Sequence, residues 1–120
     1  MSSKKIENRI KKNTEINSGI IRELQEHIAE KIKDRGFEDE TLHERLILLM
    51  EEMGELAKAC RKISRMNSNQ NKKNNFQVGE EVADIINLIF AVGIKLDLDI
   101  EKEFIKKNKK VDKRIYRRSK

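Results

Sequence analysis

The stretch Leu46-Ile47-Leu48-Leu49-Met50-Glu51-Glu52-Met53-Gly54-Glu55-Leu56-Ala57 decides the fold, because it places acidic residues inside an apolar helical segment. A second stretch, Glu80-Glu81-Val82-Ala83-Asp84, leads directly into the apolar run Ile85-Ile86-Asn87-Leu88-Ile89-Phe90. Carboxylates are almost never fully buried unless they are paired or hold a metal ion. The two stretches therefore predict two core helices that bring a group of acids together.

The acids in these stretches have helical spacing. Residues three apart on a helix share a face, so Glu52 lies beside Glu55, and Glu81 beside Asp84. If both apolar stripes face one core, the four carboxylates converge, and their repulsion favours a bound cation. Ligands that are all oxygen suit Mg²⁺ or Mn²⁺. One such pair alone is usually a solvated helix face, whereas two pairs embedded in apolar stripes indicate a metal site.

Other metals fit the sequence less well. Zinc is disfavoured because no histidine or cysteine lies near the four acids by spacing. Carboxylate-bridged di-iron bundles use Glu-x-x-His pairs, and the two acidic stretches contain no histidine. Asp97-Leu98-Asp99-Ile100-Glu101 begins like a calcium loop but lacks the glycine at its sixth position and the glutamate at its twelfth. We discard these alternatives.

Composition favours a single helical domain. The chain has 120 residues, of which 40% are charged, with no proline and five glycines, and this favours long helices over hairpins. No apolar run approaches the roughly 18 residues of a membrane span, and Met1-Ser2-Ser3-Lys4-Lys5 does not resemble a secretory signal. One cysteine cannot form an internal disulfide, so we expect a cytoplasmic protein.

The first half of the chain is expected to hold an arm and two helices. Residues 1–16 are polar and predict a mobile or loosely helical arm before a helical domain over 17–120. A helix from Ile20 to about Asp34 follows, and Gly36 is placed to end it. Thr41-Leu42-His43-Glu44 has the form of a capping box. It starts a second helix, to about Met66, with Met53 on its apolar stripe.

The second half predicts two further helices. The segment from Asn67 to Asn75 contains five asparagines and is expected to be a polar connection. A third helix should run from about Asn75 to Leu96, with Val82 and Ile89 in the core. Asp97-Leu98-Asp99 breaks this helix and caps a fourth, Ile100 to Arg117. We therefore predict an all-α fold, a four-helix bundle.

The apolar surface exceeds what one small bundle can cover. Four successive apolar residues turn around more than half a helix, so at least one of Ile47 and Leu48 faces away from the local core. A large exposed apolar patch would be a liability. We therefore predict a homo-oligomer, either a dimer or a tetramer.

Three motifs in order resemble the MazG-like, all-α nucleoside triphosphate pyrophosphohydrolases. The segment Leu49 to Ala57 is similar to the family's L-x-E-E-x-G-E-L-A, and Gly79 to Ile85 is similar to x-E-E-L-A-D-V. Asn108 to Arg114 resembles the late segment N-x-K-F-x-x-R, with Val111 in place of the phenylalanine. The resemblance extends over about Ile20 to Arg117, which is most of the chain.

The resemblance implies a Mg²⁺-dependent enzyme that cleaves a nucleoside triphosphate to the monophosphate and pyrophosphate. Glu51 would hold a metal ligand in place or orient the attacking water, and Glu51 and Glu52 are the expected catalytic residues. By motif position, the metal ligands would be Glu52, Glu55, Glu81 and Asp84. The phosphate-binding residues would be Asn108, Lys110 and Arg114.

Two alternatives use the same bundle. From Lys102 to Lys120 there are ten lysines or arginines and two acids, so a non-enzymatic nucleotide- or nucleic-acid-binding regulatory module is one reading. A nucleotide-binding protein with negligible turnover is the other. The gathered carboxylates favour the enzyme, and we expect no nucleic-acid partner. The base is undefined, because without tryptophan only Phe37, Phe76, Phe104 or Tyr116 could stack on it.

Overall fold

The protein is described by a computed structural model over residues 18–63 and 68–114, with side chains excluded over 68–76. The helices are α2 (Ile20–Asp34), α3 (Leu42–Ile63), α4 (Ser68–Lys95) and α5 (Ile100–Lys113). Within these residues there is no strand, so the all-α prediction is confirmed. The arm expected over residues 1–16 lies outside the described part. No described helix has the length and apolar character needed to cross a membrane.

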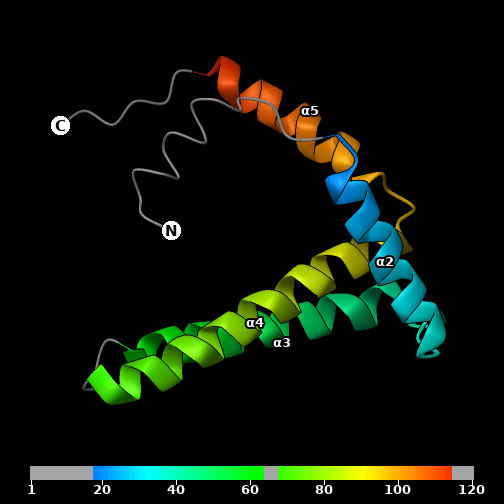
Figure 1. The fold of residues 1–120 in the computed structure, drawn as a ribbon. Helices are drawn as coiled ribbons and strands as arrows, with labels where there is room; N and C mark the ends of the chain where they lie inside the picture. Colours follow the sequence, from blue (N-terminus) through cyan, green and yellow to red (C-terminus); the bar gives the residue numbers. More distant parts are fainter. Residues whose placement is uncertain (1–17, 64–67, 115–120) are drawn as a thin grey trace.

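The helices form an open arrangement built on one long pair. Figure 1 shows α3 and α4 side by side, with α2 crossing them at one end and α5 leading away from that end. The radius of gyration is 17.7 Å, compared with roughly 13 Å for a compact domain of this length. A single chain therefore leaves much of its helical surface uncovered.

Local signals in the sequence set the ends of the first two helices. After α2, Gly36 has a φ of 79°, and the N–H groups of Gly36 and Phe37 donate to the carbonyls of Lys33 and Ile32 at 3.0 and 2.9 Å. This pair of hydrogen bonds is the Schellman motif, a helix ending that favours glycine. At the start of α3, the Thr41 hydroxyl accepts from the Glu44 N–H at 3.1 Å. Both predicted caps are confirmed.

The polar connection expected over 67–75 is wrong. The structure has α4 beginning at Ser68, so the asparagine-rich segment is the first part of this helix and the predicted start near Asn75 is late. Asparagine, glutamine and lysine cost a helix only a few tenths of a kcal/mol each, and the segment contains neither of the strong helix breakers, glycine and proline. Composition alone therefore suggested a loop where no backbone signal required one.

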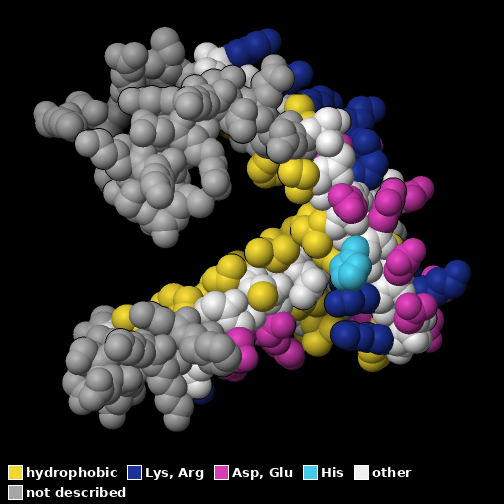
Figure 2. Space-filling model, in the orientation of Figure 1, with side chains coloured by type: hydrophobic (Ala, Val, Ile, Leu, Met, Phe, Trp, Pro, Cys, Tyr) yellow, Lys and Arg dark blue, Asp and Glu magenta, His cyan; other side chains and the backbone are white. Residues whose placement is uncertain are grey.

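Few apolar side chains are buried in one chain. The buried apolar residues of the described part are Ile28, Ala59, Phe90 and Ala91. Met53, Val82 and Ile89, expected in the core, are 55%, 41% and 49% exposed, because α3 and α4 cover each other along only one side. Figure 2 shows hydrophobic side chains in a continuous band along the α3–α4 pair.

A buried carboxylate joins α5 to the start of α2. Gly19 precedes α2 and has no side chain to cap it. Glu101, only 2% exposed, takes this role by accepting from the Gly19 N–H at 2.7 Å and pairing with Arg22 at 3.3 Å. Asp99 caps α5 by accepting from the Lys102 N–H at 3.2 Å, and this hydrogen bond, aided by Arg22, lowers the pKa of Asp99.

Replacing Glu101 with alanine should lower the free energy of unfolding by about 1–3 kcal/mol, because the part-buried Gly19 N–H and Arg22 lose their acceptor. Glu101→Gln keeps an oxygen acceptor and should lose less. Glu103→Ala, an exposed acid on the same helix, should change stability by less than about 0.5 kcal/mol. Urea unfolding followed by circular dichroism measures all three, and equal midpoints for the two alanine variants would contradict this role.

Candidate metal centre

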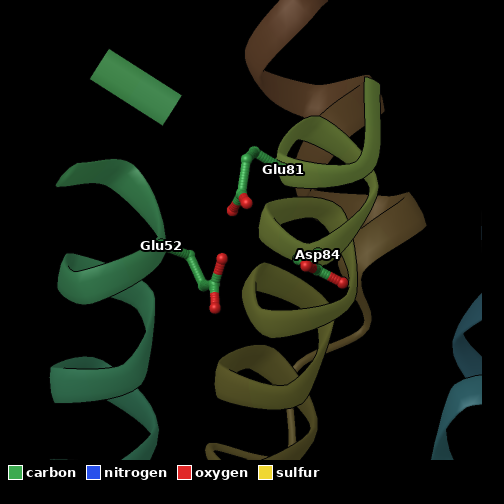
Figure 3. Close-up of side chains that lie close together, drawn as sticks. All are labelled: Glu52, Glu81 and Asp84. Atoms are coloured by element: carbon green, nitrogen blue, oxygen red, sulfur yellow. The ribbon is translucent and has the colours of Figure 1, made fainter. Parts of the chain in front are cut away.

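Three carboxylates meet between the two long helices. Glu52 lies in the middle of α3, and Glu81 and Asp84 are one turn apart on the neighbouring α4 (Figure 3). One carboxylate oxygen from each lies within 4.8 Å of the others. Glu52 and Glu81 are half-buried, and Asp84 is exposed. The pairing of α3 with α4 thus brings together acids that are distant in sequence.

The charges in this group are not compensated by a cation from the described residues. The pKa of Glu81 is raised to about 7, first by a hydrogen bond shared with Glu52, then by partial burial and by repulsion from Glu52, Asp84 and Glu55. The Oε2 atom of Glu81 is buried and has no hydrogen-bond partner in the described part of the chain. A divalent cation would supply both the missing partner and the missing charge, so the donor set fits one.

The other two predicted acids lie at the edge of this group. Glu55 is exposed on α3 and is not one of the three residues whose oxygens lie within 4.8 Å, although its charge helps to raise the pKa of Glu81. Glu51 is also exposed and outside the group. Neither assignment is tested by the geometry of one chain.

A pocket opens beside the carboxylates. Its volume is about 510 Å³, and Glu52 and Asp84 line it on the side of α3 and α4. From α2 and the loop that follows come two cations and an aromatic ring, and α4 adds an amide; these residues are Lys31, Arg35, Phe37 and Asn87. The pocket thus combines carboxylates, cations and an aromatic ring with apolar lining residues. This combination suits a phosphate ester that binds a metal ion and carries a planar base.

Sequence reasoning missed most of this pocket. It named Phe37 only as one of several aromatic residues, and it did not single out Lys31, Arg35 or Asn87. Two spacings carried a signal: Lys31 and Arg35 are one turn apart on α2, and Asn87 follows Asp84 by one turn. We refer to the cavity lined by these residues as the nucleotide pocket, after the ligand that the sequence resemblance implies.

The three residues expected to bind phosphates lie on α5, away from this pocket. The Asn108 side chain donates to the Phe104 carbonyl of its own helix at 3.1 Å, and the Arg114 N–H, at the end of α5, donates to the Val111 carbonyl at 3.0 Å. Lys110 lines a second groove, of about 580 Å³, between α2 and α5. Its other cationic residues are Arg22, Lys102, Lys106, Lys109 and Lys113. None of the three lines the nucleotide pocket in one chain.

The sequence profile of a dUTPase family matches residues 4–118. The chain belongs to this family. The dUTPase family in question is all-α and related to the MazG-type nucleotide pyrophosphohydrolases, while the MazG-like name itself is not confirmed. No curated protein and no solved structure matched the chain.

Membership in the dUTPase family supports a coarse function. It indicates a hydrolase-like action on nucleoside triphosphates, and families of this kind depend on a metal ion. The carboxylates of Glu52, Glu81 and Asp84, whose oxygens lie close together, are the candidate site for such an ion.

The proton on Glu81 predicts how metal-free stability changes with pH. Its folded pKa, about 7, lies above the usual 4.5, so the folded chain binds the proton more tightly than the unfolded chain does. This contribution to stability is present below pH 4.5 and is lost as the pH rises through about 7. Without metal, the melting temperature of the wild type should therefore fall between about pH 5 and 8, relative to Glu81→Gln.

Thermal melts in a chelator over this pH range check the prediction. Glu81→Gln is the matched control because it keeps the side-chain volume and cannot titrate. Melting curves for the two proteins that shift in parallel with pH would show that Glu81 does not carry the effect.

Proposed function

We propose that this protein is a Mg²⁺-dependent nucleoside triphosphate pyrophosphohydrolase that converts dUTP to dUMP and pyrophosphate. The observation that carries the proposal is the group of Glu52, Glu81 and Asp84, whose ligand oxygens lie within 4.8 Å of one another beside a pocket that contains cations. The dUTPase family match supports a triphosphate as the substrate and makes dUTP the first candidate.

The metal would be held by Glu52, Glu81 and Asp84, with Glu55 as the fourth ligand that the motif implies. When bound, Mg²⁺, or Mn²⁺ in its place, would neutralise phosphate charge and make a bound water more acidic. Glu81 must give up its proton before it can act as a ligand, because a neutral carboxyl is a weak donor to a cation. Glu51 would orient the attacking water or support a ligand, as the family motif implies.

The nucleotide pocket supplies the groups that a nucleotide needs. Lys31 and Arg35 on α2 would bind phosphate oxygens through charge-assisted hydrogen bonds. The ring of Phe37 is 51% exposed and offers a flat face for a base. The Asn87 amide has both a donor and an acceptor and could pair with the edge of a pyrimidine. In this proposal the reacting phosphates would lie between Lys31 and Arg35 on one side and the acids of α3 and α4 on the other.

The assignment of Asn108, Lys110 and Arg114 to the phosphates stays a proposal that requires a second subunit. In one chain α5 leads away from the α3–α4 pair (Figure 1), and Lys110 lines a different groove. These residues could meet a substrate on Glu52 and Asp84 only from a neighbouring chain. We therefore propose a homo-oligomer, either a dimer or a tetramer, as the active form.

In the deciding experiment the purified protein is incubated with Mg²⁺ and one nucleotide at a time. The nucleotides are dUTP, dCTP, dTTP, UTP and ATP. Release of pyrophosphate and the monophosphate, highest with dUTP, is the expected result. Release of inorganic phosphate would indicate a different cleavage position. Binding of a non-hydrolysable dUTP analogue without turnover would support the nucleotide-binding alternative.

The lysine-lined groove between α2 and α5 is the observation that favours the nucleic-acid alternative. It gathers five lysines with Arg22, and its acid, Glu101, is already paired with that arginine. Binding to labelled DNA or RNA with a steep salt dependence, unaffected by nucleotide, would support that alternative over the enzyme.

A further inference from the structure

Arg45 is a buried charge that the proposed chemistry does not use. It lies in the first turn of α3 and is only 2% exposed. Arginine is almost never buried unless its donors are paired. The identity of its partners therefore indicates what the residue does.

Within the described part of the chain, the partners of Arg45 all belong to the wall of the nucleotide pocket. Its Nη1 donates to the Ala91 carbonyl at 2.6 Å, and its Nη2 donates to the Phe37 carbonyl at 3.2 Å. Its Nε lies 3.7 Å from Oε1 of Glu40. Ala91, Phe37 and Glu40 all line the pocket, and Arg45 itself does not. The guanidinium therefore lies behind the pocket wall. It links the loop that carries Phe37 to Ala91 on α4.

The loop that carries Phe37 has little else to hold it against α4. Its start is fixed to α2 by the hydrogen bond from the Phe37 N–H to the Ile32 carbonyl, at 2.9 Å. On the side of α4, Lys95 donates to the Glu38 carbonyl at 3.2 Å. The ring of Phe37 is half exposed, so packing does not fix it. Arg45 is the buried tie between this loop and α4.

We propose that Arg45 is a positioning residue that sets the width of the nucleotide pocket by holding Phe37 and Glu40 at a fixed distance from Ala91. The proposal rests on the function proposed above, because it assumes that the pocket takes a nucleotide. Arginine suits the task because its planar fork presents separate donors to the Ala91 and Phe37 carbonyls while its charge pairs with Glu40. A lysine has a single nitrogen and cannot span them.

Loss of Arg45 should therefore weaken nucleotide binding more than it slows chemistry. Phe37 would contact the substrate equally in the ground state and in the transition state, so its displacement raises KM and leaves kcat nearly unchanged. Two hydrogen bonds from a charged group are lost, and we expect Arg45→Met to raise KM about tenfold or more. Arg45→Lys, which keeps the charge but not the fork, should recover only part of this loss.

The experiment uses the absence of tryptophan from the chain. Phe37→Trp places the chain's single tryptophan in the pocket wall, and its anisotropy, excited selectively over Tyr116, reports how firmly the loop is held. Adding Arg45→Met should lower this anisotropy and weaken binding of a non-hydrolysable dUTP analogue about tenfold. Binding of Mn²⁺ to the carboxylates should stay within about twofold, because Arg45 touches none of them. Lys33→Met, an exposed lysine outside both pockets, is the control.

Each outcome of this experiment either supports or contradicts the positioning role of Arg45. A folded Arg45→Met protein with unchanged anisotropy and affinity would overturn the proposal. If Arg45→Met does not fold, Arg45→Lys decides, since it keeps the buried charge and loses the planar fork. It should lower the anisotropy and weaken binding about threefold, and no change in either would overturn the proposal. Lack of dUTP turnover by the wild type, with anisotropy still dependent on Arg45, would refute the enzyme but not the positioning role.

Discussion

Replacing Asp84 with asparagine should lower turnover of the triphosphate by at least about 100-fold, equivalent to about 2.7 kcal/mol of transition-state stabilisation. The change removes one charge from the three close carboxylates and keeps the shape of the side chain. Glu52→Gln should have a similar effect, because Glu52 is the carboxylate that α3 contributes to the close group. Initial rates of pyrophosphate release at several Mg²⁺ concentrations measure both losses.

The fold should survive these changes. Removing one of several crowded acids relieves repulsion, so the melting temperature without metal should stay level or rise. Glu103→Gln, an exposed acid on α5, is the control and should keep full activity. Near-normal turnover of Asp84→Asn at low Mg²⁺ would show that the ligand assignment is wrong.

Glu55→Gln separates a three-carboxylate site from a four-carboxylate site. A loss as large as that of Asp84→Asn would make Glu55 a fourth ligand, as the motif implies. A loss below about tenfold would restrict the ligands to Glu52, Glu81 and Asp84, which lie close together without metal.

Local signals explain why so much of the fold was predictable. Thr41, Gly36 and Asp99 each satisfy backbone groups within a few residues of themselves, so their roles can be inferred from sequence alone. The same holds for the spacing of Glu81 and Asp84 on one helix. Their meeting with Glu52 was predictable because both acidic stretches lie beside apolar stripes that must face each other.

The parts that the sequence did not reveal depend on tertiary placement. Arg45 occupies a first helical turn that predicts solvent exposure, and only the return of α4 buries it. Lys31 and Arg35 became pocket residues because α2 crosses the α3–α4 pair at that end (Figure 1). The position of Lys110 depends on the direction of α5, which is fixed by the contacts of Glu101 with Arg22 and Gly19 and not by the spacing of residues along α5.

Ile86→Glu should convert an oligomer into a monomer. Val82, Ile86 and Ile89 form one stripe on α4 and are 41%, 45% and 49% exposed, and on α3 Met50 and Met53 are 71% and 55% exposed. An unpaired carboxylate within such an interface costs several kcal/mol, which exceeds what a dimer of moderate affinity can absorb. Light scattering at micromolar concentration should give a multiple of 14.1 kDa for the wild type and the single mass for the variant.

Glu80→Gln, which changes an exposed charge on the same helix, should leave the mass unchanged. A wild-type mass of 14.1 kDa would refute the oligomer and would point to the N-terminal arm as the cover for the apolar stripes. The loss of assembly in Ile86→Glu should also reduce turnover, provided that α5 acts on the substrate of a neighbouring subunit.

Mixing two weakened variants tests that last step. Asp84→Asn damages the carboxylates, and the double variant Lys110→Ala and Arg114→Ala damages the basic helix, so each alone should be weakly active. In a randomly mixed dimer about half of the molecules carry one chain of each kind, and one of their two sites then contains neither change. Activity should recover to about a quarter of the wild type. If mass measurements show that the chains exchange and activity still does not recover, Lys110 and Arg114 do not act at the carboxylate site of a neighbouring chain.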